Sequence, residues 1–535
     1  MALHAAYLFI AATLVAVYLT RSIQRRNARD RLARQHGCEP LTLAYNKLPF
    51  GLDRKWQIVT HRGNILDDLI TTRFAELGSY IYTDNQWGSP PIICAEPAAI
   101  KAVLSTKFRD WDMDSNRYPA LGPWLGRGVL VSSHQGKGSL WLTARTLLRP
   151  MFASVATYNH ALMEKSVQDF LSTMSRVNED SATRSDLLPL IRRLNIDIIT
   201  AIFCGGSIGA QKKGLEAGPR AAAAAAAAAS PGKKPTLEEA FDAIEPIAGL
   251  RLQTGSLYWL FTSKPFRDAC DTFSELANGW INQALRKTQE KSSPQGGGLG
   301  DVAEAAQSFT EELVSSTEDR ELLRDILVQL LFAGIDTSTS MLSFALLELG
   351  RHPGSWTRLR AELAEHSLLS AGPETITAGQ LKDCVFLQNV VKETLRLYPP
   401  VPINSREAIR DTVLPTGGGA DGSKPVFVPK GTSLKYSPYV MHRRSDLYGP
   451  DAMEWNPDRW LGRSHGWDYL PFNGGPRICI GQKFALTAGA YVLTRLAQQF
   501  DTCEAASSNK GPLESKLGAV LIPAAGVPVS LGNSS

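Results

Sequence analysis

The chain has 535 residues, 44% of them hydrophobic and 20% charged, which is the composition of a folded globular protein and excludes a disordered one. This length exceeds one ordinary hydrophobic core, so several subdomains or one large fold are expected. The formal net charge of +5 is too small for a chain of this size to indicate nucleic-acid binding.

The first expected element is an apolar segment at the N-terminus. Residues 3–20 are apolar apart from His4 and a few Thr and Tyr residues, and a helix of that length is about 27 Å long, just enough to cross a bilayer. A cleaved signal peptide is the alternative, but such peptides carry positive charge before the apolar run. Here six arginines follow it, between Arg21 and Arg34. We therefore predict a single-pass transmembrane anchor over 1–20 in the endoplasmic reticulum membrane, followed by a basic and hinge segment over 21–50 on the cytosolic side.

The rest of the chain, 51–535, predicts one mainly α-helical domain with small β-sheets. β-rich pieces at 80–83 and 91–94 indicate a hairpin, and those at 412–414 and 426–428 indicate two strands around a polar loop. Between these two regions, from about residue 140 to 400, the pattern is mostly helical.

Two low-complexity segments interrupt the helical region. Residues 205–235 contain nine consecutive alanines, and residues 291–300 contain three consecutive glycines. The alanine run has no amphipathic face and stands between helix-breaking residues, so we expect both segments to be surface insertions without chemistry.

The seven cysteines are scattered, odd in number and free of any C-x-x-C pair. This pattern argues against a disulfide framework or a zinc site and fits a reducing compartment.

Trp141 and Arg145 are four residues apart and share one face of an expected helix. An indole and a guanidinium so placed can both donate to an anionic ligand, although a Trp packed over an Arg stem is the ordinary alternative.

The strongest expected helix covers about 321–351 and contains the sequence Ala-Gly-Ile-Asp-Thr-Ser at 333–338. Gly, Asp, Thr and Ser disfavour a helix centre, because of backbone entropy and competing side-chain hydrogen bonds. Asp336 and Thr337 are therefore candidates for an acid–alcohol pair that relays protons, beside a groove opened at Gly334. The alternative is an ordinary helix with a glycine packing contact and a polar exposed face.

A second helical segment at 388–397 places Glu393 and Arg396 three residues apart on one face. Alone, such a pair is usually a solvated surface pair worth a few tenths of a kcal/mol. A further arginine, Arg459, occurs in Asn-Pro-Asp-Arg-Trp at 456–460, shortly before the segment at 472–481 described next.

Cys479 lies in Phe-Asn-Gly-Gly-Pro-Arg-Ile-Cys-Ile-Gly, residues 472–481, directly before an expected helix. Glycines let the backbone approach a flat ligand closely, and Arg477 offers donors that suit a carboxylate. A sulfur at a helix N-terminus is stabilised as a thiolate. These features favour an axial haem ligand.

Together, these motifs resemble the cytochrome P-450 superfamily of haem-thiolate monooxygenases. The segment 472–481 matches the family pattern F-x-x-G-x-R-x-C-x-G at every fixed position, and five motifs occur in the family's order. Residues 48–51, 472–482 and 484–487 are also similar to the fungal membrane-bound alkane and fatty-acid hydroxylases. The expected fold is therefore the cytochrome P-450 fold, preceded by one transmembrane helix.

The resemblance implies a role for each motif around haem b (iron protoporphyrin IX). Cys479 is the expected iron ligand, and Asp336 and Thr337 are the expected proton relay. Glu393, Arg396 and Arg459 are expected to be structural, and His442 to lie near a propionate or at a surface strand end. The residues expected to bind the cofactor are Trp141, Arg145, Arg406, Phe472, Arg477 and Gly481, and those expected near the substrate are Ala333, Ile335, Val401, Pro402 and Ile403.

The resemblance also implies a reaction. Electrons are expected from an NADPH-dependent cytochrome P-450 reductase, and the substrate is expected to be an apolar fatty acid or alkane hydroxylated at or near its terminus. A tailoring oxidase acting on a polyketide or terpenoid is the alternative, and a haem-thiolate isomerase or dehydratase or an inactive haem-binding protein is a more remote one. No nucleic-acid partner is expected.

Overall fold

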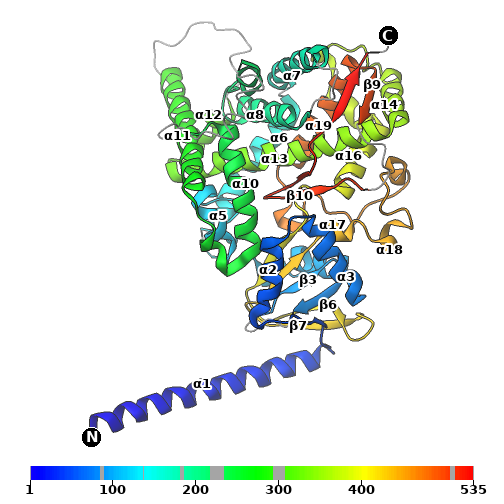
Figure 1. Cartoon of the computed structure of the whole chain (residues 1–535). Coiled ribbons are helices and arrows are strands. Elements are labelled where there is room, and N and C mark those ends of the chain that lie inside the picture. Colours follow the sequence, from blue (N-terminus) through cyan, green and yellow to red (C-terminus); the bar gives the residue numbers. More distant parts are fainter. Residues whose placement is uncertain are drawn as a thin grey trace.

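The computed structural model describes residues 2–84, 90–136, 138–158, 160–180, 186–216, 234–292, 308–505 and 512–533. Helices make up most of the body, and small sheets lie at its lower end, in its middle and near the C-terminus, which confirms the expected class (Figure 1). The longer helices are α1 (Ala2–Gln35), α2 (Leu52–Thr60), α3 (Thr72–Leu77), α5 (Arg117–Leu125), α6 (Leu140–Tyr158), α7 (His160–Asp180), α8 (Leu188–Phe203), α10 (Leu237–Thr254), α11 (Lys264–Ser292), α12 (Phe309–Ser316), α13 (Arg320–Arg351), α14 (Pro353–Glu365), α15 (Ala378–Asp383), α16 (Val385–Leu397) and α19 (Gln482–Gln499). Shorter ones are α4 (Pro97–Lys101), α17 (Pro438–Met441) and α18 (Ser445–Tyr448).

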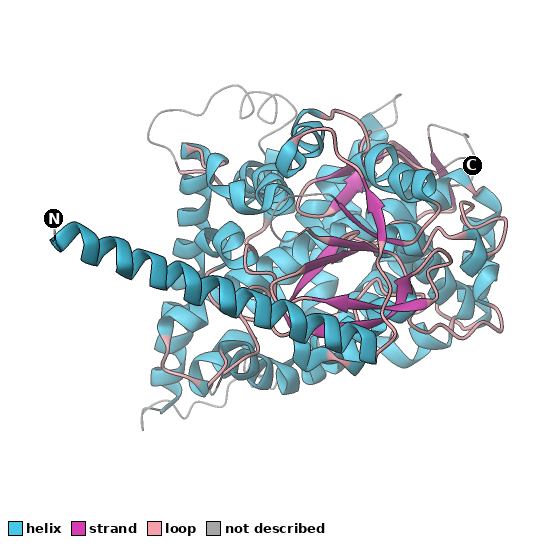
Figure 2. Cartoon of the chain, turned by 90° about the horizontal axis from the view of Figure 1, so that it is seen from below, coloured by secondary structure: helices cyan, strands magenta, loops and turns pink. Residues whose placement is uncertain are grey.

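The largest sheet has six strands in the order β1-β2-β3-β8-β5-β4, and the others described have two strands each. Figure 2 shows the strands in magenta among the helices. β2 pairs with β3 in antiparallel fashion, which confirms the expected hairpin, and β6 pairs with β7 as expected. The strands are β1 (Thr42–Ala44), β2 (Ile81–Asp84), β3 (Ile92–Cys94), β4 (Trp111–Asp112), β5 (Asn404–Ala408), β6 (Thr412–Gly418), β7 (Lys424–Val428), β8 (Ser433–Tyr436), β9 (Thr502–Ala505), β10 (Ser515–Leu517), β11 (Leu521–Pro523) and β12 (Val529–Gly532).

The long helix α13 runs through the centre of the body and covers the predicted range almost residue for residue. The Asp319 side chain caps its N-terminus by accepting from the Leu322 N–H, and α13 ends before Pro353. At Gly334 an added Cβ would come within 2.6 Å of the Ile199 side chain on α8. The glycine therefore allows two helices to pack closely, as the alternative interpretation of this segment expected.

The N-terminal helix α1 projects away from the body and continues through the arginine-rich segment without a break. It ends at Gln35, and Gly37 then takes a positive φ of 61°. Arg29 joins α1 to the body by donating two hydrogen bonds to Asp411, at 3.1 and 3.2 Å. Residues 48–51, where a hinge is expected, include a short 3₁₀ turn that leads into α2.

Within the described residues, α13 is the helix long and apolar enough to cross a membrane, and 72% of its most apolar window is buried. This burial identifies α13 as a core helix of the folded body. The anchor predicted over 1–20 stays a prediction.

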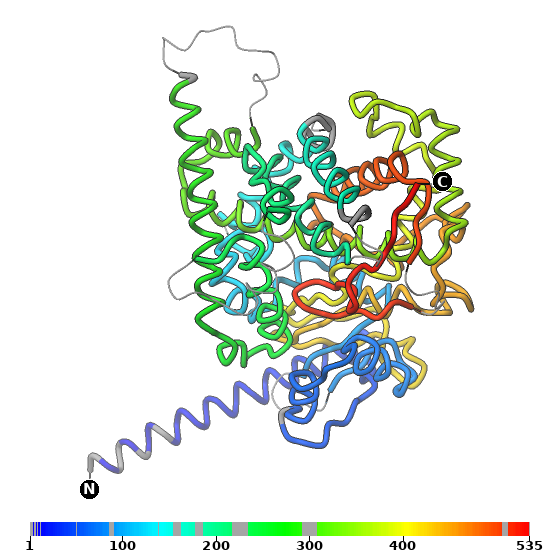
Figure 3. The backbone as a smooth tube through the Cα atoms, turned by 45° about the horizontal axis from the view of Figure 1, so that its top comes forward, coloured from blue at the N-terminus to red at the C-terminus, as the bar shows by residue number. Residues whose placement is uncertain are grey.

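The C-terminal hairpin of β10 and β11 reaches across the molecule to α10 (Figure 3). An added Cβ on Gly249 of α10 would meet the Gly518 carbonyl oxygen at 2.6 Å, so the two segments are in close contact. The alanine run of the first low-complexity segment, and most of the second, lie outside the described residues.

Candidate active site

The loop that carries Cys479 is held in a tight conformation directly before α19. The Cys479 N–H donates to the Phe472 carbonyl at 2.9 Å, and the Ile478 N–H donates to the Gly475 carbonyl at 3.0 Å. Gly475 has a φ of +68°, and an added Cβ there would lie 1.8 Å from the Leu104 carbonyl oxygen, so this position requires glycine. Gly481 forms the N-cap of α19.

All seven cysteines are described, and Cys479 is the exposed one. Burial nevertheless raises the pKa of its thiol, opposed by the Gly481 N–H and by the charge of Arg145. A side chain that is surrounded by protein atoms and still accessible lies at the bottom of a recess. Cys479 is therefore placed to bind a ligand that enters this recess.

Four arginines from separate segments gather their positive charge around Arg477, two residues before Cys479. Arg145 comes from α6, Arg477 from the cysteine loop, Arg406 from β5 and Arg117 from α5. Burial, and then the charge of Arg406, lower the pKa of Arg117 to about 10. Burial and the charge of Arg406 also lower the pKa of Arg477 to about 9, and the charges of Arg117 and Arg145 add to this effect. Such crowding of cations is stabilised by an anionic ligand.

The arginine N–H groups of this cluster fit the two propionates of haem, and the Cys479 sulfur fits its iron. In the described part of the chain, the buried Nε atoms of Arg406 and Arg477 have no hydrogen-bond partner. The Trp141 ring lies 4.6 Å from the Arg477 guanidinium and 5.8 Å from that of Arg145, so this indole sits between the two arginines. A soft sulfur ligand beside several cations is the donor set that an anionic iron porphyrin requires.

The three residues expected to be structural, Glu393, Arg396 and Arg459, meet in one cluster, in which Glu393 and Arg396 are fully buried. Arg396 donates to both oxygens of Glu393, at 2.8 and 2.9 Å, and Arg459 Nε donates to Glu393 Oε1 at 3.3 Å. The Asn456 N–H adds a bond of 2.9 Å, and the Trp460 indole N–H donates to Glu393 Oε2 at 3.0 Å. Trp460 thus contributes a hydrogen bond that a phenylalanine could not make.

His442 does not lie at a surface strand end, because it is fully buried, and both of its ring nitrogens bind backbone groups. Its Nε2 accepts from the Leu470 N–H at 2.8 Å, so its Nδ1 is the atom that donates to the Arg396 carbonyl at 3.0 Å. Burial lowers the pKa of this imidazole to about 3, which keeps it neutral. His442 connects α16 to the segment before the cysteine loop.

Asp336 and Thr337 point to different sides of α13. The Thr337 hydroxyl donates to the Ala333 carbonyl at 2.5 Å on a half-buried face. Asp336 is buried against α8, with Arg192 Nε 3.7 Å from its Oδ1. Burial and the nearby charge of Glu245 raise the Asp336 pKa to about 8, although Arg192 opposes this. The acid can therefore hold a proton at neutral pH.

The residues expected near the substrate have different exposures. Ala333 is half-buried on the same face as Thr337, whereas Ile335 is fully buried. After α16, Val401 is 37% exposed and Ile403 is half-buried, while the Pro402 carbonyl accepts from Ser437 Oγ at 3.0 Å. Ala333, Val401 and Ile403 are thus the accessible members of this set.

Sequence reasoning missed Arg117, Trp124 and Arg192. Trp124 on α5 packs edge-on against Phe332 of α13 at 4.5 Å, and its indole nitrogen has no partner among the described residues. Arg192 interrupts the apolar face of α8, and a charged residue in an otherwise apolar helix could have identified it from the sequence. No local pattern marks Arg117.

The chain is similar to known proteins over most of its length. Residues 59–528 match the family model described as Cytochrome P450. The chain is 76% identical over 538 residues to "Cytochrome P450 monooxygenase milC" of Cordyceps militaris, covering 100% of both chains. It is 36% identical over 499 residues to "Cytochrome P450 monooxygenase himC" of Aspergillus japonicus (92% and 84% covered) and 38% identical over 475 residues to "Cytochrome P450 52A3-A" of Candida maltosa (86% of each).

Proposed function

The chain belongs to the cytochrome P450 family and is a haem-containing monooxygenase, and we propose that it hydroxylates an apolar acyl chain at or near its terminus, as in a fatty acid or an alkane. The observation that carries this proposal is the accessible Cys479 in a loop whose Arg477 lies within a cluster of arginines. The similarity of the scaffold segments to the fungal alkane and fatty-acid hydroxylases supports the acyl chain as substrate.

The residues of the site then have separate roles. Bound haem supplies the activation of dioxygen, with electrons that we propose come from an NADPH-dependent cytochrome P450 reductase. Cys479 would supply the sulfur that binds the iron, and Arg145, Arg406 and Arg477, together with Arg117, would hold the carboxylates of the group. The Glu393 cluster fixes the position of the cysteine loop.

Asp336 and Thr337 of α13 supply protons. Asp336 holds a proton near neutral pH, and Arg192 orients its carboxyl group from α8. Thr337 keeps its lone pairs free to accept a hydrogen bond on the half-buried face while its own proton is donated to Ala333.

We also propose that α1 anchors the enzyme in the endoplasmic reticulum membrane. Large apolar side chains on this helix are exposed, including Phe9 at 75% and Tyr18 at 72%. A projecting helix with so much exposed apolar surface is expected to partition into lipid.

A binding screen tests the substrate proposal. Fatty acids, alkanes, terpenoids and polyketides are added to the purified enzyme, and the low-to-high-spin shift of the haem is recorded. The compounds that shift the spin state are then incubated with reductase and NADPH, and the position of oxygen insertion is determined. A terminally hydroxylated acyl chain supports the proposal, whereas turnover of terpenoids or polyketides alone would exclude it.

A further inference from the structure

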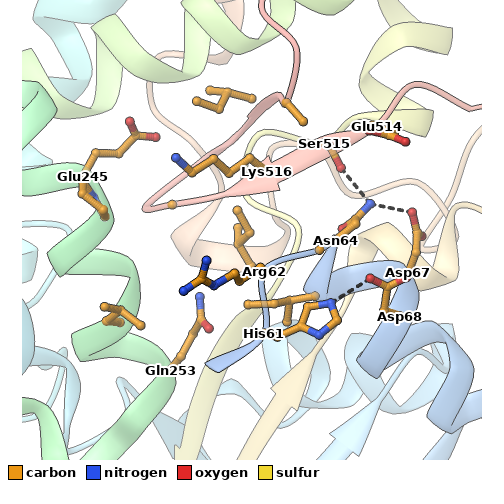
Figure 4. A pocket seen from close by; sticks show the side chains of 18 of the residues that line it. His61, Arg62, Asn64, Asp67, Asp68, Glu245, Gln253, Glu514, Ser515 and Lys516 are labelled. Carbon is orange, nitrogen blue, oxygen red and sulfur yellow. Dashed lines mark hydrogen bonds and ion pairs between the residues drawn. The ribbon is translucent and has the colours of Figure 1, made fainter. Parts of the chain in front are cut away.

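Two aspartates of the described chain pair with a histidine, and the two pairs have different surroundings. Asp68 lies 2.7 Å from His61, and both line the pocket between α2, α10 and the C-terminal hairpin (Figure 4). The Asp68 side chain is 49% exposed, so solvent screens its charge. Asp112 lies 2.9 Å from His134, and these side chains are only 5% and 7% exposed. The charge of Asp112 is therefore screened far less than that of Asp68.

Asp112 is also the carboxylate that lies beside the arginine cluster of the candidate haem site. It ends β4, whose partner strand β5 carries Arg406. Its Oδ1 lies 3.6 Å from Arg477 Nη2. Within the described residues, no other carboxylate forms an ion pair with any of the four arginines. Asp112 therefore places one negative charge next to this group of cations.

Hydrogen bonds keep Asp112 in its charged form. Its Oδ1 accepts from the Met113 N–H at 2.7 Å and from the His134 N–H at 3.2 Å, and its Oδ2 accepts from the Ser133 hydroxyl. The amide nitrogen of Gln135 lies 2.9 Å from His134 Nε2, so Nε2 accepts there and Nδ1 carries the proton that faces Asp112. Burial alone would raise the pKa of Asp112, but the hydrogen bonds outweigh it and hold the pKa below its usual value. Asp112 is therefore a carboxylate at neutral pH.

We propose that Asp112 lowers the reduction potential of bound haem by holding a fixed negative charge beside Arg477, one of the arginines assigned to the haem carboxylates. One-electron reduction of ferric to ferrous haem adds one negative charge to the group. A buried carboxylate nearby opposes this change, because the protein interior screens their repulsion only weakly. Asp112 acts through Arg477 and is thus a positioning residue, which makes the resting enzyme accept its first electron less readily. The effect does not depend on which substrate the enzyme oxidises.

The test measures the midpoint potential of the full-length, haem-loaded enzyme without substrate. The protein is titrated with dithionite in the presence of redox mediators, and the ferric and ferrous forms are followed by their absorption. Asp112→Asn removes the charge and keeps the shape of the side chain.

Two matched controls remove a carboxylate elsewhere. Asp197 is 2% exposed and, like Asp112, accepts from a serine hydroxyl and from two backbone N–H groups, at 2.7 and 2.9 Å, but it forms no ion pair with the arginine cluster. Asp197→Asn therefore repeats the loss of a buried, hydrogen-bonded carboxylate. Asp68→Asn removes the charge of the exposed His–Asp pair.

Asp112→Asn is expected to shift the equilibrium toward the ferrous form about fivefold. This shift raises the midpoint potential by about 40 mV, because a tenfold change corresponds to about 59 mV for one electron. Both controls should stay within about twofold of the wild type. An unchanged or lower potential in Asp112→Asn, or an equal rise in Asp197→Asn, would overturn the proposed charge effect.

Two variants at His134 give a second measurement that leaves the buried carboxylate in place. His134→Lys adds a positive charge close to Asp112, and His134→Gln does not. The neighbouring Ser133 and Gln135 are exposed, so a lysine here can extend its ammonium group to solvent without unfolding the loop. His134→Lys is expected to have the higher potential of the two, and equal or reversed potentials would contradict the proposal. The carbon monoxide difference spectrum, recorded on every variant, shows separately whether the haem-thiolate site is intact.

Discussion

Replacing Trp460 by Phe tests how much its hydrogen bond to the buried Glu393 stabilises the fold. Glu393 Oε2 accepts two hydrogen bonds, from Arg396 Nε at 2.9 Å and from Trp460 at 3.0 Å, and Glu393 is fully buried. Trp460→Phe keeps an aromatic ring but leaves Oε2 with one donor. A hydrogen bond to a charged group contributes about 1.5–3 kcal/mol. Since four other bonds to this carboxylate remain, we expect a loss of about 1.5 kcal/mol in the free energy of unfolding.

Trp455→Phe is the matched control. Trp455 is equally buried, but its indole donates to the neutral hydroxyl of Thr394 at 3.2 Å, so its loss should cost about 0.5–1 kcal/mol. Urea unfolding followed by far-ultraviolet circular dichroism compares the two variants without relying on tryptophan fluorescence. If Trp460→Phe is no more destabilising than Trp455→Phe, a hydrogen bond to the buried carboxylate of Glu393 stabilises the fold no more than one to a neutral hydroxyl, which would refute the prediction.

Two further predictions concern α13. The folded protein keeps the Asp336 proton up to about pH 8, whereas the unfolded chain releases it near 3.8, so this group makes the fold less stable as the pH rises between these values. Asp336→Asn removes that loss. Its free energy of unfolding in urea should therefore rise relative to that of the wild type between pH 5.5 and 8, by about 3 kcal/mol at most, and parallel pH profiles would contradict the assignment. Thr337→Ala should lower the product formed per NADPH consumed several-fold, while Thr339→Ala, buried and bonded to Asn195 at 3.2 Å, should leave that ratio unchanged. Equal ratios in both variants would remove Thr337 from the relay.

The parts of the site that could be predicted from the sequence are those that depend on residues close together in the chain. Glu393 and Arg396 are three residues apart on one helix, and the positive φ of Gly475 in the cysteine loop is a local backbone property that a glycine in the sequence can indicate. The hairpin of β2 and β3 and the length of α13 follow from alternation and helix-ending signals in the same way.

What could not be predicted depends on contacts between distant segments. Arg117 reaches the cation cluster only because α5 lies beside β5, where it donates to Asn404 at 3.0 Å. Asp336 and Thr337 are neighbours in sequence, but successive helix residues point about 100° apart, so packing against α8 separates them. His442 is buried because α17 packs against α16, and nothing in its own segment indicates this.

The central claim is that Cys479 is the thiolate that binds the haem iron. The most direct measurement is the difference spectrum of the reduced enzyme under carbon monoxide, recorded for the wild type and for Cys479→Ala. We predict a red-shifted Soret band of thiolate ligation in the wild type that is lost in the variant. A wild type without this band, or a Cys479→Ala variant that keeps it, would contradict the account.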